Sequence, residues 1–500
     1  MMEFSVAAIE GALDRAGLRV ETRGTLPDTA SGITDDSRDV SSGSMFVAVR
    51  GSARDGHEFL EQAAARGAAV VVVEDATRTP LPAIVVRDGR RSAAVAAAAA
   101  YGEPAKSMSM IGVTGTNGKT TTVGILRHLL DGFGEKQSAS IGTLGVLVGS
   151  SGRSLPGGAD LTTPGPVELQ RVLRSLTQEG VGTVAMEVSS HSLDQRRVEG
   201  LSFEAAVFTN LTRDHLDYHG TEEAYFEAKA RLLDQIPQKG AAVVNADEPA
   251  WERLQTLVRR ISFGESPVAT VRASDVRFRA RGSAWTLMIG GEAYSVELPL
   301  IGAFNISNAL GATAAACHVG LHPRQVAGLL GTVPQVPGRL EILSEYPTVL
   351  RDYAHTPDAL ERSLMAVRPF TEGRLIVVFG CGGDRDRGKR PLMGRVASRN
   401  ADMTILTSDN PRTEDPEGIL DEVEVGLNGA PHHRVEDRRS AIELALQVAQ
   451  PNDVVVLAGK GHETYQIRGK TRFPFDEKLI VRELIGEGSG EGRAGGGMAR

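Results

Sequence analysis

Apolar positions come mainly in short runs that alternate along the chain with stretches of helical period. In the N-terminal part these runs predict strands at Met45–Val49, Ala69–Val73 and Ala83–Val86, and the spacing in His57–Arg66 predicts a helix. Short strands that alternate with helices are typical of a sheet covered by helices. This part of the chain is therefore predicted to form a small α/β domain.

The same alternation continues through the rest of the chain. Strands are predicted in the middle at Ser109–Val113, Thr183–Met186, Ala205–Thr209 and Ala241–Asn245, and near the C-terminus at Thr348–Leu350, Leu375–Phe379, Met403–Leu406 and Val454–Leu457. A β-rich insert is expected over residues 262–300 and an Ala-rich helix at Ile306–Val319. Polar loops follow these strands, and ligands of open parallel sheets bind at the carboxyl ends of strands. We therefore expect a second face of the active site near the C-terminus.

Two segments rich in Gly and Pro, Tyr101–Ser107 and Pro334–Gly338, interrupt this alternation. A single hydrophobic core stops growing near ~250–300 residues, and this chain has 500. The sequence therefore predicts three α/β domains, at residues 1–105, 106–335 and 336–485. The Gly-rich tail over residues 486–500 has almost nothing to bury and is predicted to be disordered.

Composition narrows the classes of protein that fit. The net charge of -8 is spread over interspersed signs, which argues against a nucleic-acid groove. No apolar stretch is long enough to cross a bilayer and the start lacks a signal-peptide pattern, so no membrane insertion is expected. The two cysteines, Cys317 and Cys381, exclude a disulfide scaffold and are typical of the cytoplasm. We expect a cytoplasmic monomer that acts on small molecules.

A phosphate-binding loop is predicted directly after the strand that begins at Ser109. The run is Gly115-Thr116-Asn117-Gly118-Lys119-Thr120-Thr121, and a helical pattern follows at Val123–Leu130. Glycines permit close backbone approach, the helix N-terminus and Lys119 face the phosphates, and Thr120 can reach Mg²⁺. The strict motif has a glycine where this chain has Val113, so the loop is a variant. It predicts binding of nucleotide phosphates, but such a loop alone does not separate ligases from GTPases, kinases or motors.

Acidic and histidine side chains follow two further strands of the middle part. Glu187 ends the strand that begins at Thr183, where a carboxylate can hold Mg²⁺ directly or through water. The run from Thr209 to His219 holds Asp214, His215, Asp217 and His219. This density suits a second metal or a charged substrate, although capping and turn roles explain the two aspartates as well. Lys229 lies in a helix predicted over Glu222–Leu233 and, judged alone, is expected at the surface.

In their order along the chain, these motifs resemble those of the Mur ligases of peptidoglycan synthesis, in the branch that adds the third, diamino residue. The resemblance runs from Asp36-Ser-Arg38 to Lys460-Gly-His-Glu463. It implies an N-terminal domain that binds a nucleotide sugar, a central ATPase-like domain with the phosphate loop, and a Rossmann-like C-terminal domain that binds an amino acid. The implied substrates are ATP, UDP-N-acetylmuramoyl-L-alanyl-D-glutamate and a diamino acid, with Mg²⁺ as cofactor.

The resemblance also implies roles for individual residues. Catalytic roles fall to Lys119, Glu187, His215 and Lys229, and Gly115 to Thr121 form the ATP loop. Thr120 and Glu187 hold a first Mg²⁺, His215 is a ligand of a second, and Lys229 is a carbamate that can bind metal. Further ATP contacts are Asn305, Asn308, Arg339 and Asp352. The nucleotide-sugar peptide is contacted by Ser37, Thr162, Thr163, Ser189, Gln195 and Arg197. The incoming amino acid is contacted by Arg390, Asp409, Asn410, Pro411, Arg412, Gly459 and Glu463.

The choice of amino acid is predicted from Asp409-Asn-Pro-Arg412, which resembles the signature of enzymes that use meso-diaminopimelate. Arg412 can pair bidentately with the second carboxylate of diaminopimelate, whereas lysine or ornithine would present a cation to it. An unpaired buried charge costs roughly 3–5 kcal/mol. Because similar loops occur with other diamino acids, L-lysine and L-ornithine stay open as alternatives.

The implied reaction passes through an acyl phosphate, which the amino group of the third residue displaces. Folylpolyglutamate synthetase shares this fold and chemistry, but it has no comparable need for Asp409-Asn-Pro-Arg412 or for a uridine-binding first domain. An alternative of another class is a nucleotide-operated switch or binding protein. Such a protein would hydrolyse ATP or GTP without an amino acid.

Overall fold

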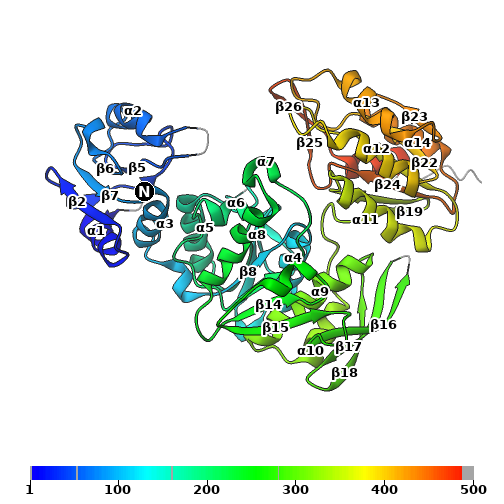
Figure 1. Ribbon diagram of the computed structural model, residues 1–500, viewed down its shortest axis with the longest axis horizontal. Coiled ribbons are helices and arrows are strands. Elements are labelled where there is room, and N and C mark those ends of the chain that lie inside the picture. Colours follow the sequence, from blue (N-terminus) through cyan, green and yellow to red (C-terminus); the bar gives the residue numbers. More distant parts are fainter. Residues whose placement is uncertain (1–2, 52–53, 159–160, 280, 487–500) are drawn as a thin grey trace, which may run out of the picture. The chain divides into compact units, whose positions relative to one another are not determined.

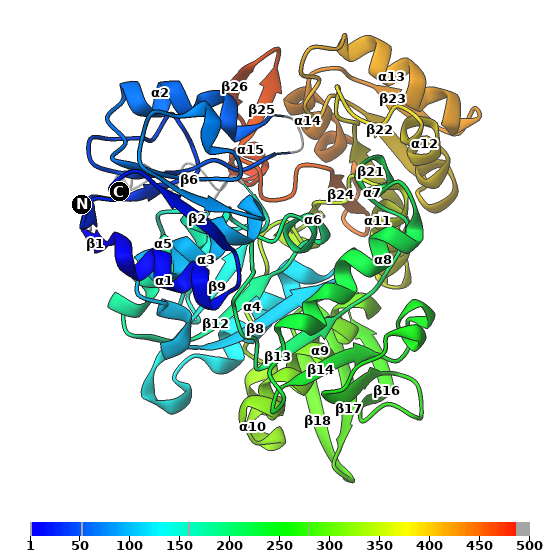
Figure 2. The same ribbon diagram turned by 60° about the vertical axis from the view of Figure 1, so that its left-hand side comes forward.

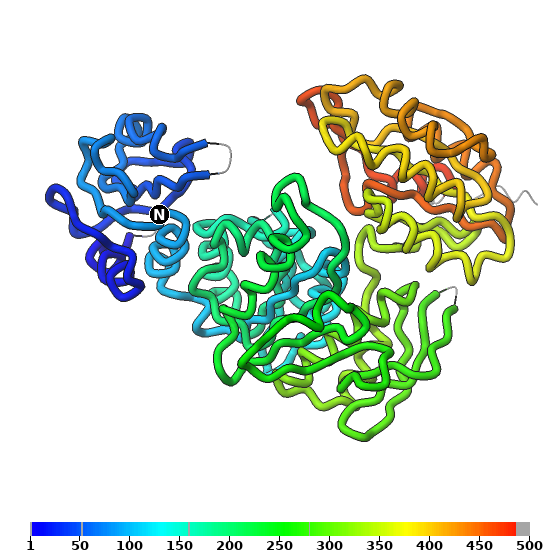
Figure 3. The backbone as a smooth tube through the Cα atoms, in the orientation of Figure 1, coloured from blue at the N-terminus to red at the C-terminus, as the bar shows by residue number. Residues whose placement is uncertain are grey.

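The computed structural model describes residues 3–51, 54–158, 161–279 and 281–486. Apart from Gly486, the predicted disordered tail lies outside these residues. The chain divides into two compact units. The first comprises the chain up to Ser274 with Thr286–Val296 and Ser307–Thr332, and the second comprises Asp275–Trp285, Glu297–Ile306 and the chain from Val333 onward. Each large sheet is built from one stretch of the chain, and Figure 3 lets the reader follow these stretches by colour.

The N-terminal part of the first unit forms a five-stranded sheet in the order β2-β7-β6-β5-β4. Its strands are β2 (Arg19–Arg23), β4 (Ile33–Thr34), β5 (Met45–Val47), β6 (Val70–Val73) and β7 (Ala83–Val86), and its helices are α1 (Val6–Arg15), α2 (Leu60–Ala65) and α3 (Gly89–Ala100). A short pair joins β1 (Phe4–Ser5) to β3 (Thr29–Ala30). Alternate residues of β6 face opposite sides, so Val70 and Val72 pack with α1 and α3 while Val71 and Val73 pack with α2 (Figure 1).

The middle of the chain forms an 11-stranded sheet in the order β11-β10-β9-β12-β8-β13-β14-β15-β16-β17-β18. Its strands are β8 (Ser109–Thr114), β9 (Gln137–Gly142), β10 (Gly145–Val148), β11 (Arg153–Leu155), β12 (Val181–Glu187), β13 (Ala205–Phe208), β14 (Ala241–Asn245), β15 (Arg259–Gly264), β16 (Val271–Arg279), β17 (Gly282–Ile289) and β18 (Glu292–Leu298). The helices are α4 (Lys119–Leu130), α5 (Pro166–Gln178), α6 (Ser190–Asp194), α7 (Leu216–His219), α8 (Glu222–Ala230), α9 (Ala303–Val319) and α10 (Pro323–Leu330). The expected β-rich insert corresponds to β15–β18.

Four neighbouring strands at the centre of this sheet, β12, β8, β13 and β14, are parallel. Their carboxyl ends therefore lie along one edge, where polar loops meet. The paired residues Glu187 and Val113 place the end of β12 beside the end of β8. Phe208 pairs with Thr114, which places the loop after β13 on the other side. The sheet thus brings together three loops that are distant in sequence.

The second unit holds a doubly wound sheet in the order β19-β20-β24-β21-β22-β23, parallel except for β19. Its strands are β19 (Glu341–Glu345), β20 (Thr348–Asp352), β21 (Leu375–Phe379), β22 (Met403–Leu406), β23 (His432–Arg434) and β24 (Val454–Ala458), with a separate hairpin of β25 (Tyr465–Arg468) and β26 (Thr471–Pro474). One face is covered by α11 (Pro357–Val367), α12 (Lys389–Asn400) and α13 (Pro416–Glu424), and the other by α14 (Arg438–Val448) and α15 (Glu477–Ile485).

A fully buried ion pair joins the two helices on the second of these faces. The side chains of Arg438 and Glu477 are both 0% exposed, and Arg438 Nε lies 2.8 Å from Glu477 Oε1. Arg438 also donates to the carbonyl of Ala458, at the end of β24, over 2.9 Å. The pair therefore fixes the end of a central strand.

Replacement of Glu477 by alanine is expected to lower the free energy of unfolding by about 3–5 kcal/mol, because it leaves a buried cation without its partner. The matched control is Glu483→Ala in the same helix. Glu483 pairs with Arg439 at the surface, where an ion pair contributes about 0–1 kcal/mol. Urea unfolding followed by circular dichroism measures both variants. Equal midpoints for the two would contradict the expectation.

Among the described residues, no helix combines the length and the apolar composition that crossing a membrane requires.

The helix predicted at Val123–Leu130 begins earlier in the structure, because α4 starts at Lys119. The apolar period starts only at Val123, and the preceding Lys-Thr-Thr-Thr turn carries no such signal. The predicted segment Tyr101–Ser107 ends in a 3-10 turn at Pro104–Ser107.

Candidate active site

The loop between β8 and α4 has the backbone of a phosphate cradle. Gly118 has φ 85° and caps α4, and a Cβ atom built on it would lie 2.2 Å from Asn308 Oδ1. At Gly115, with φ 147°, a Cβ would lie 1.9 Å from Thr209 Oγ1. Both positions therefore require glycine. The first N–H groups of α4 have no acceptor within the helix, which makes its N-terminus suited to an anion.

The predicted loop residues lie around this cradle. Lys119 Nζ donates to the carbonyls of Gly115 and Thr116, each over 2.8 Å, so its ammonium lies across the loop. Thr120 and Thr121 are buried on the first turn of α4. Asn308, which was expected to contact ATP, lies beside Gly118 and accepts from Thr122 Oγ1 over 3.4 Å.

The loop is held in place by two residues that follow β13. Asn210 Oδ1 accepts from the N–H of Asn117 over 2.8 Å, and Asn210 Nδ2 donates to the carbonyl of Asn117 over 3.2 Å. Thr209 Oγ1 donates to the same carbonyl over 2.7 Å. Asn210 was not predicted, because the pattern of this segment drew attention only to its acids and histidines. Its position directly after a buried strand is the signal that could have found it.

Lys229 is buried, contrary to what its place in a polar helix indicated. Its side chain donates from Nζ to the carbonyl of Gly115 over 2.8 Å, and Nζ lies 4.6 Å from the centre of the Tyr225 ring. Burial lowers the pKa of Lys229 well below its usual value, and the nearby charge of Lys119 adds to the effect. Two lysines thus converge on one loop carbonyl. They come from helices α4 and α8, which are labelled in Figure 2.

Glu187 ends β12 as predicted and is buried, with 1% of its surface exposed. Its Oε1 accepts from the N–H of Thr143 over 2.8 Å, and its Oε2 accepts from Thr143 Oγ1 over 3.2 Å. A Cβ on Gly142 would lie 2.2 Å from Glu187 Oε1, so the glycine makes room for the carboxylate. The carboxylate is therefore held rigidly at the strand end beside the phosphate loop.

The acidic and histidine side chains after β13 have different polar partners. Asp214 Oδ2 lies 3.4 Å from His215 Nε2, while Asp214 Oδ1 accepts from the N–H of His215, which is the turn role considered above. Burial lowers the pKa of His215, and Lys119 and Lys229 lower it further. His219 instead lies 3.0 Å from Ser190 Oγ in α6. Among the described residues, no cluster of three His, Cys, Asp or Glu side chains forms a metal cage.

Five of the six residues expected to contact the nucleotide-sugar peptide lie together. Thr163 Oγ1 donates to the carbonyl of Glu187 over 2.9 Å and accepts from the N–H of Ser189 over 3.1 Å. Arg197 donates to the carbonyl of Thr163 over 2.9 Å and to Gln195 Oε1 over 2.6 Å. Thr162 Oγ1 lies 3.4 Å from Thr143 Oγ1. These contacts connect the group to the carboxylate of Glu187.

Ser37 is the sixth residue, and it lies in the N-terminal sheet region. It donates to Gln62 Oε1 over 3.1 Å.

Two residues that were not predicted, Tyr218 and Asp194, hold Gln195 in place. Gln195 Nε2 donates to Tyr218 OH over 3.1 Å, and Tyr218 OH donates to Asp194 Oδ2 over 2.9 Å. No local pattern in the sequence indicates this chain of hydrogen bonds.

Three further residues expected to contact ATP belong to the second unit. Asp352 ends β20 and accepts from the N–H of Leu340 over 2.8 Å and from Ser363 Oγ over 2.9 Å. Burial raises the pKa of Asp352. The guanidinium of Arg339 lies 4.7 Å from the centre of the Tyr353 ring. Asn305 is buried and donates to the carbonyl of Ile301 over 2.8 Å.

The loops after β22 and β24 bring together most residues expected to contact the amino acid. Asn410 Nδ2 donates to Glu463 Oε2 over 2.9 Å. Gly459, with φ 114°, approaches so closely that a Cβ would lie 2.9 Å from Asp409 Oδ2. Pro411 is buried, and Arg412 has φ 52° and donates from its guanidinium to the carbonyl of Gly383 over 2.8 Å. Lys460, which was not predicted as a site residue, is fully buried between these loops.

Arg390, which is expected to contact the amino acid, is held by two carboxylates. It is fully buried, and its guanidinium lies 2.8 Å from both Glu414 and Glu422. The hydrogen bond from Arg390 is the main cause that lowers the pKa of Glu414 to about 2. Arg390 thus joins α12 to the loop before α13, where it supports the backbone around Arg412.

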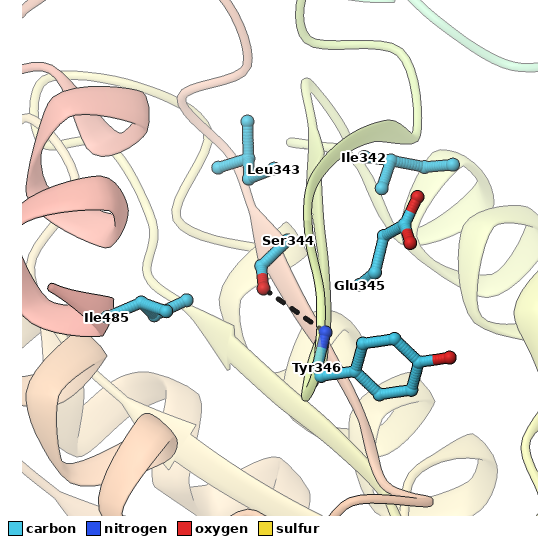
Figure 4. Close-up of a pocket in the computed structure, with 6 residues that line it drawn as sticks. All are labelled: Ile342, Leu343, Ser344, Glu345, Tyr346 and Ile485. Carbon is cyan, nitrogen blue, oxygen red and sulfur yellow. Dashed lines mark hydrogen bonds between the residues drawn. The ribbon is translucent and has the colours of Figure 1, made fainter. Parts of the chain in front are cut away.

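A pocket of about 460 Å³ lies at the edge strand β19, lined by Ile342, Leu343, Ser344, Glu345, Tyr346 and Ile485 (Figure 4). Ser344 Oγ accepts from the N–H of Tyr346 over 3.3 Å. None of the lining residues was predicted to belong to the active site. The candidate site is formed by strand-end loops instead.

Profiles of known families match all three parts of the chain. The Mur ligase family, catalytic domain, matches residues 29–107; the Mur ligase middle domain matches residues 113–316; and the Mur ligase, glutamate ligase domain, matches residues 338–461. These matches, with the observed sheets, confirm the predicted three-domain α/β fold class. The exact boundaries at residues 105 and 335 stay predictions.

Relatives of similar length match almost the whole chain. A UDP-N-acetylmuramoyl-L-alanyl-D-glutamate–2,6-diaminopimelate ligase of Geobacillus kaustophilus is 45% identical over 90% of this chain and 94% of its own. A ligase of the same name from Geobacter metallireducens is 44% identical over 94% of this chain and 98% of its own. A solved structure of a ligase with this name superposes with a TM-score of 0.67, is 35% identical, and covers 94% of this chain and 97% of its own. The chain therefore belongs to the Mur ligase family.

Proposed function

We propose that the protein is an ATP-dependent ligase that joins meso-diaminopimelate to UDP-N-acetylmuramoyl-L-alanyl-D-glutamate. The observation that carries this proposal is the arrangement around the phosphate loop, where Lys119 and Lys229 meet at the Gly115 carbonyl and Glu187 stands at the neighbouring strand end. Relatives that match over 90% or more of the chain are named as ligases with this activity, which supports the proposal.

The residues around the loop suit ATP with Mg²⁺. Thr120 offers a hydroxyl and Glu187 a carboxylate, and oxygen ligands are those that Mg²⁺ prefers. Mg²⁺ is usually held by one or two carboxylates and by substrate phosphates, and the buried Glu187 supplies one such carboxylate. When bound, Mg²⁺ would neutralise charge on the phosphate oxygens.

Lys229 is proposed to act as a carbamate. Its lowered pKa favours the neutral amine, which is the form whose nitrogen adds to the carbon of CO₂ and then releases a proton. The product is an anion close to Lys119, and it replaces a buried neutral amine by a group that can hold a metal. His215, whose pKa is also lowered, has the neutral ring that metal binding requires.

The reaction would proceed in two steps. The side-chain carboxylate of D-glutamate attacks the γ-phosphorus of ATP, the bond to the bridging oxygen breaks, and ADP leaves. The amine nitrogen of the third residue then attacks the acyl carbon, inorganic phosphate leaves, and the nitrogen loses a proton. Lys119 and the N–H groups of the loop would stabilise the charge on the transferred phosphoryl group.

The amino-acid loops of the second unit suit a diamino acid with a second carboxylate. Arg412 supplies a guanidinium that can pair with this carboxylate, and Glu463 supplies an acceptor for an ammonium. Lysine and ornithine lack this second carboxylate and would give the Arg412 guanidinium no anion to pair with. Diaminopimelate is therefore the proposed substrate.

Release of inorganic phosphate from ATP and Mg²⁺ is expected only when both the nucleotide-sugar dipeptide and diaminopimelate are present. Parallel reactions contain lysine or ornithine in place of diaminopimelate, and the ligated product is identified by mass. Phosphate release that needs neither the nucleotide sugar nor an amino acid would favour the nucleotide-operated switch. Turnover with lysine or ornithine but without diaminopimelate would contradict only the choice of amino acid.

A further inference from the structure

Lys460, in the loop after β24, is a buried cation to which the proposed reaction gives no role. Its side chain is 0% exposed, and its Nζ lies 3.1 Å from Asn410 Oδ1, 3.0 Å from Glu463 Oε2 and 3.6 Å from Asp409 Oδ1. A buried ammonium is costly unless anions and acceptors surround it. The loops after β22 and β24 therefore fold around this one side chain.

The charges around Lys460 do not balance. Two carboxylates, those of Asp409 and Glu463, face one ammonium, which leaves a net charge of −1 in this cluster. Asp409 is 6% exposed, and among the described residues its Oδ1 accepts no hydrogen bond. Buried polar atoms in native proteins nearly always have a partner. The missing partner is therefore expected to be a cationic donor from a ligand.

Lys460 also determines which way the Asn410 amide points. Asn410 Oδ1 accepts from Lys460 Nζ and from the N–H of Ile467, the latter over 2.9 Å. Because both donors engage the oxygen, the NH₂ group must face the other way, and it donates to Glu463 Oε2 over 2.9 Å. Glu463 Oε2 thus receives two donors, which fixes its carboxylate and leaves Oε1 for a ligand.

We propose that Lys460 is a positioning residue for recognition of the amino acid: by orienting Asn410 and Glu463, it makes Glu463 Oε1 and Asp409 Oδ1 the acceptors for an ammonium group of the substrate. This inference rests on the proposed function, because it assigns the charge of the group that the amino-acid site receives. Lys460 itself does not touch the reacting atoms.

The test compares steady-state constants of three variants, Lys460→Met, Lys460→Gln and the exposed control Lys470→Met. Lys460→Met is expected to raise the KM for diaminopimelate by about 10- to 100-fold, the equivalent of one lost charged hydrogen bond. The KM values for ATP and for the nucleotide sugar are expected to stay within about twofold. Lys460→Gln keeps a donor and is expected to recover part of the loss. Lys470→Met is expected to behave like the wild type.

A double-mutant cycle separates positioning from general support of the fold. If Lys460 acts through Asn410, the Lys460→Met/Asn410→Ala variant should raise the KM for diaminopimelate little more than the stronger single variant. An unchanged KM in a folded Lys460→Met protein would overturn the inference, as would an equal rise in all three KM values. If Lys460→Met does not fold, the same comparison is made with Lys460→Gln.

If the proposed function were wrong, the wild-type assays would give different results from those that overturn the role of Lys460. In that case the wild type itself would release phosphate without an amino acid, or would use lysine or ornithine. With another diamino acid as substrate, the KM for that amino acid takes the place of the KM for diaminopimelate in the same comparison. The role of Lys460 is then decided independently of the substrate's identity.

Discussion

Replacement of Lys229 by alanine is expected to lower the rate of ligation by about 10³-fold or more, the loss seen when an electrostatic group of an active site is removed. The physical reason is the position of its amine, 2.8 Å from the Gly115 carbonyl and beside Lys119. A carbamate formed there would supply the anion that holds the metal next to the phosphate loop. Phosphate release and product formation, measured with all three substrates, check this expectation.

Short carboxylic acids are expected to restore part of the activity of Lys229→Ala, because formate or acetate can occupy the place of the carbamate. The matched control is Lys239→Met, which changes an exposed lysine in the same unit and should leave the rate unchanged. An active Lys229→Ala variant would rule out a catalytic carbamate. If the Lys229→Ala variant is inactive and no carboxylic acid restores its activity, Lys229 would have a structural role in the loop and not a catalytic one as a carbamate.

Stability should change in the opposite direction from activity. The pKa of Lys229 is lowered on folding, so below the usual lysine value of about 10.4 the unfolded chain binds more protons than the native protein. The free energy of unfolding therefore decreases as the pH falls from about 10 towards the lowered pKa of Lys229. The Lys229→Met variant lacks this cost and is expected to have a Tm at or above that of the wild type, with a difference that grows as the pH is lowered.

Lys119→Met is the second change with a large expected effect. Its ammonium lies across the loop, 2.8 Å from the carbonyls of Gly115 and Thr116, where it can reach the phosphates of ATP. Loss of this charge is expected to lower kcat by about 10³-fold, because the transferred phosphoryl group loses a stabilising cation. The KM for ATP should rise far less, since the loop N–H groups remain.

Lys136→Met serves as the control for this change, because Lys136 is exposed a short distance after α4. The KM for diaminopimelate should stay unchanged in both variants. If Lys119→Met kept more than about a tenth of the wild-type kcat, the loop would not be the site of phosphoryl transfer in the sense of the phosphate-loop enzymes. The proposed function would then lose its main support.

Much of the fold could be predicted from local pattern. The strands at Ala83–Val86, Ala241–Asn245, Leu375–Phe379 and Met403–Leu406 have the predicted bounds, because each is a short apolar run between polar loops. Helix α4 was predicted too short, since the turn at its start lacks apolar residues and its first residue is set by the glycine cap. Local period identifies elements better than it identifies their ends.

The candidate site was predicted only in part. Residues that belong to a compact motif, such as Gly115 to Thr121, lie together as expected, because a continuous loop keeps its members close whatever the rest of the chain does. Asn210 and Lys460 were missed, because their roles depend on partners from other strand ends, 93 positions away for Asn117 and 50 for Asn410. Hydrogen bonds over such separations leave no local pattern.

The sequence by itself determined the alternation of strands and helices, the glycines and the lysine of the phosphate loop, and the order of the motifs, since each depends on neighbours in the chain. Only the tertiary structure decided that Lys229 is buried against a carbonyl 114 positions away, that Arg390 is engaged by two glutamates, and that Lys460 orients Asn410 and Glu463. The physical reason is that burial and charge pairing depend on which strand ends the parallel sheets bring side by side.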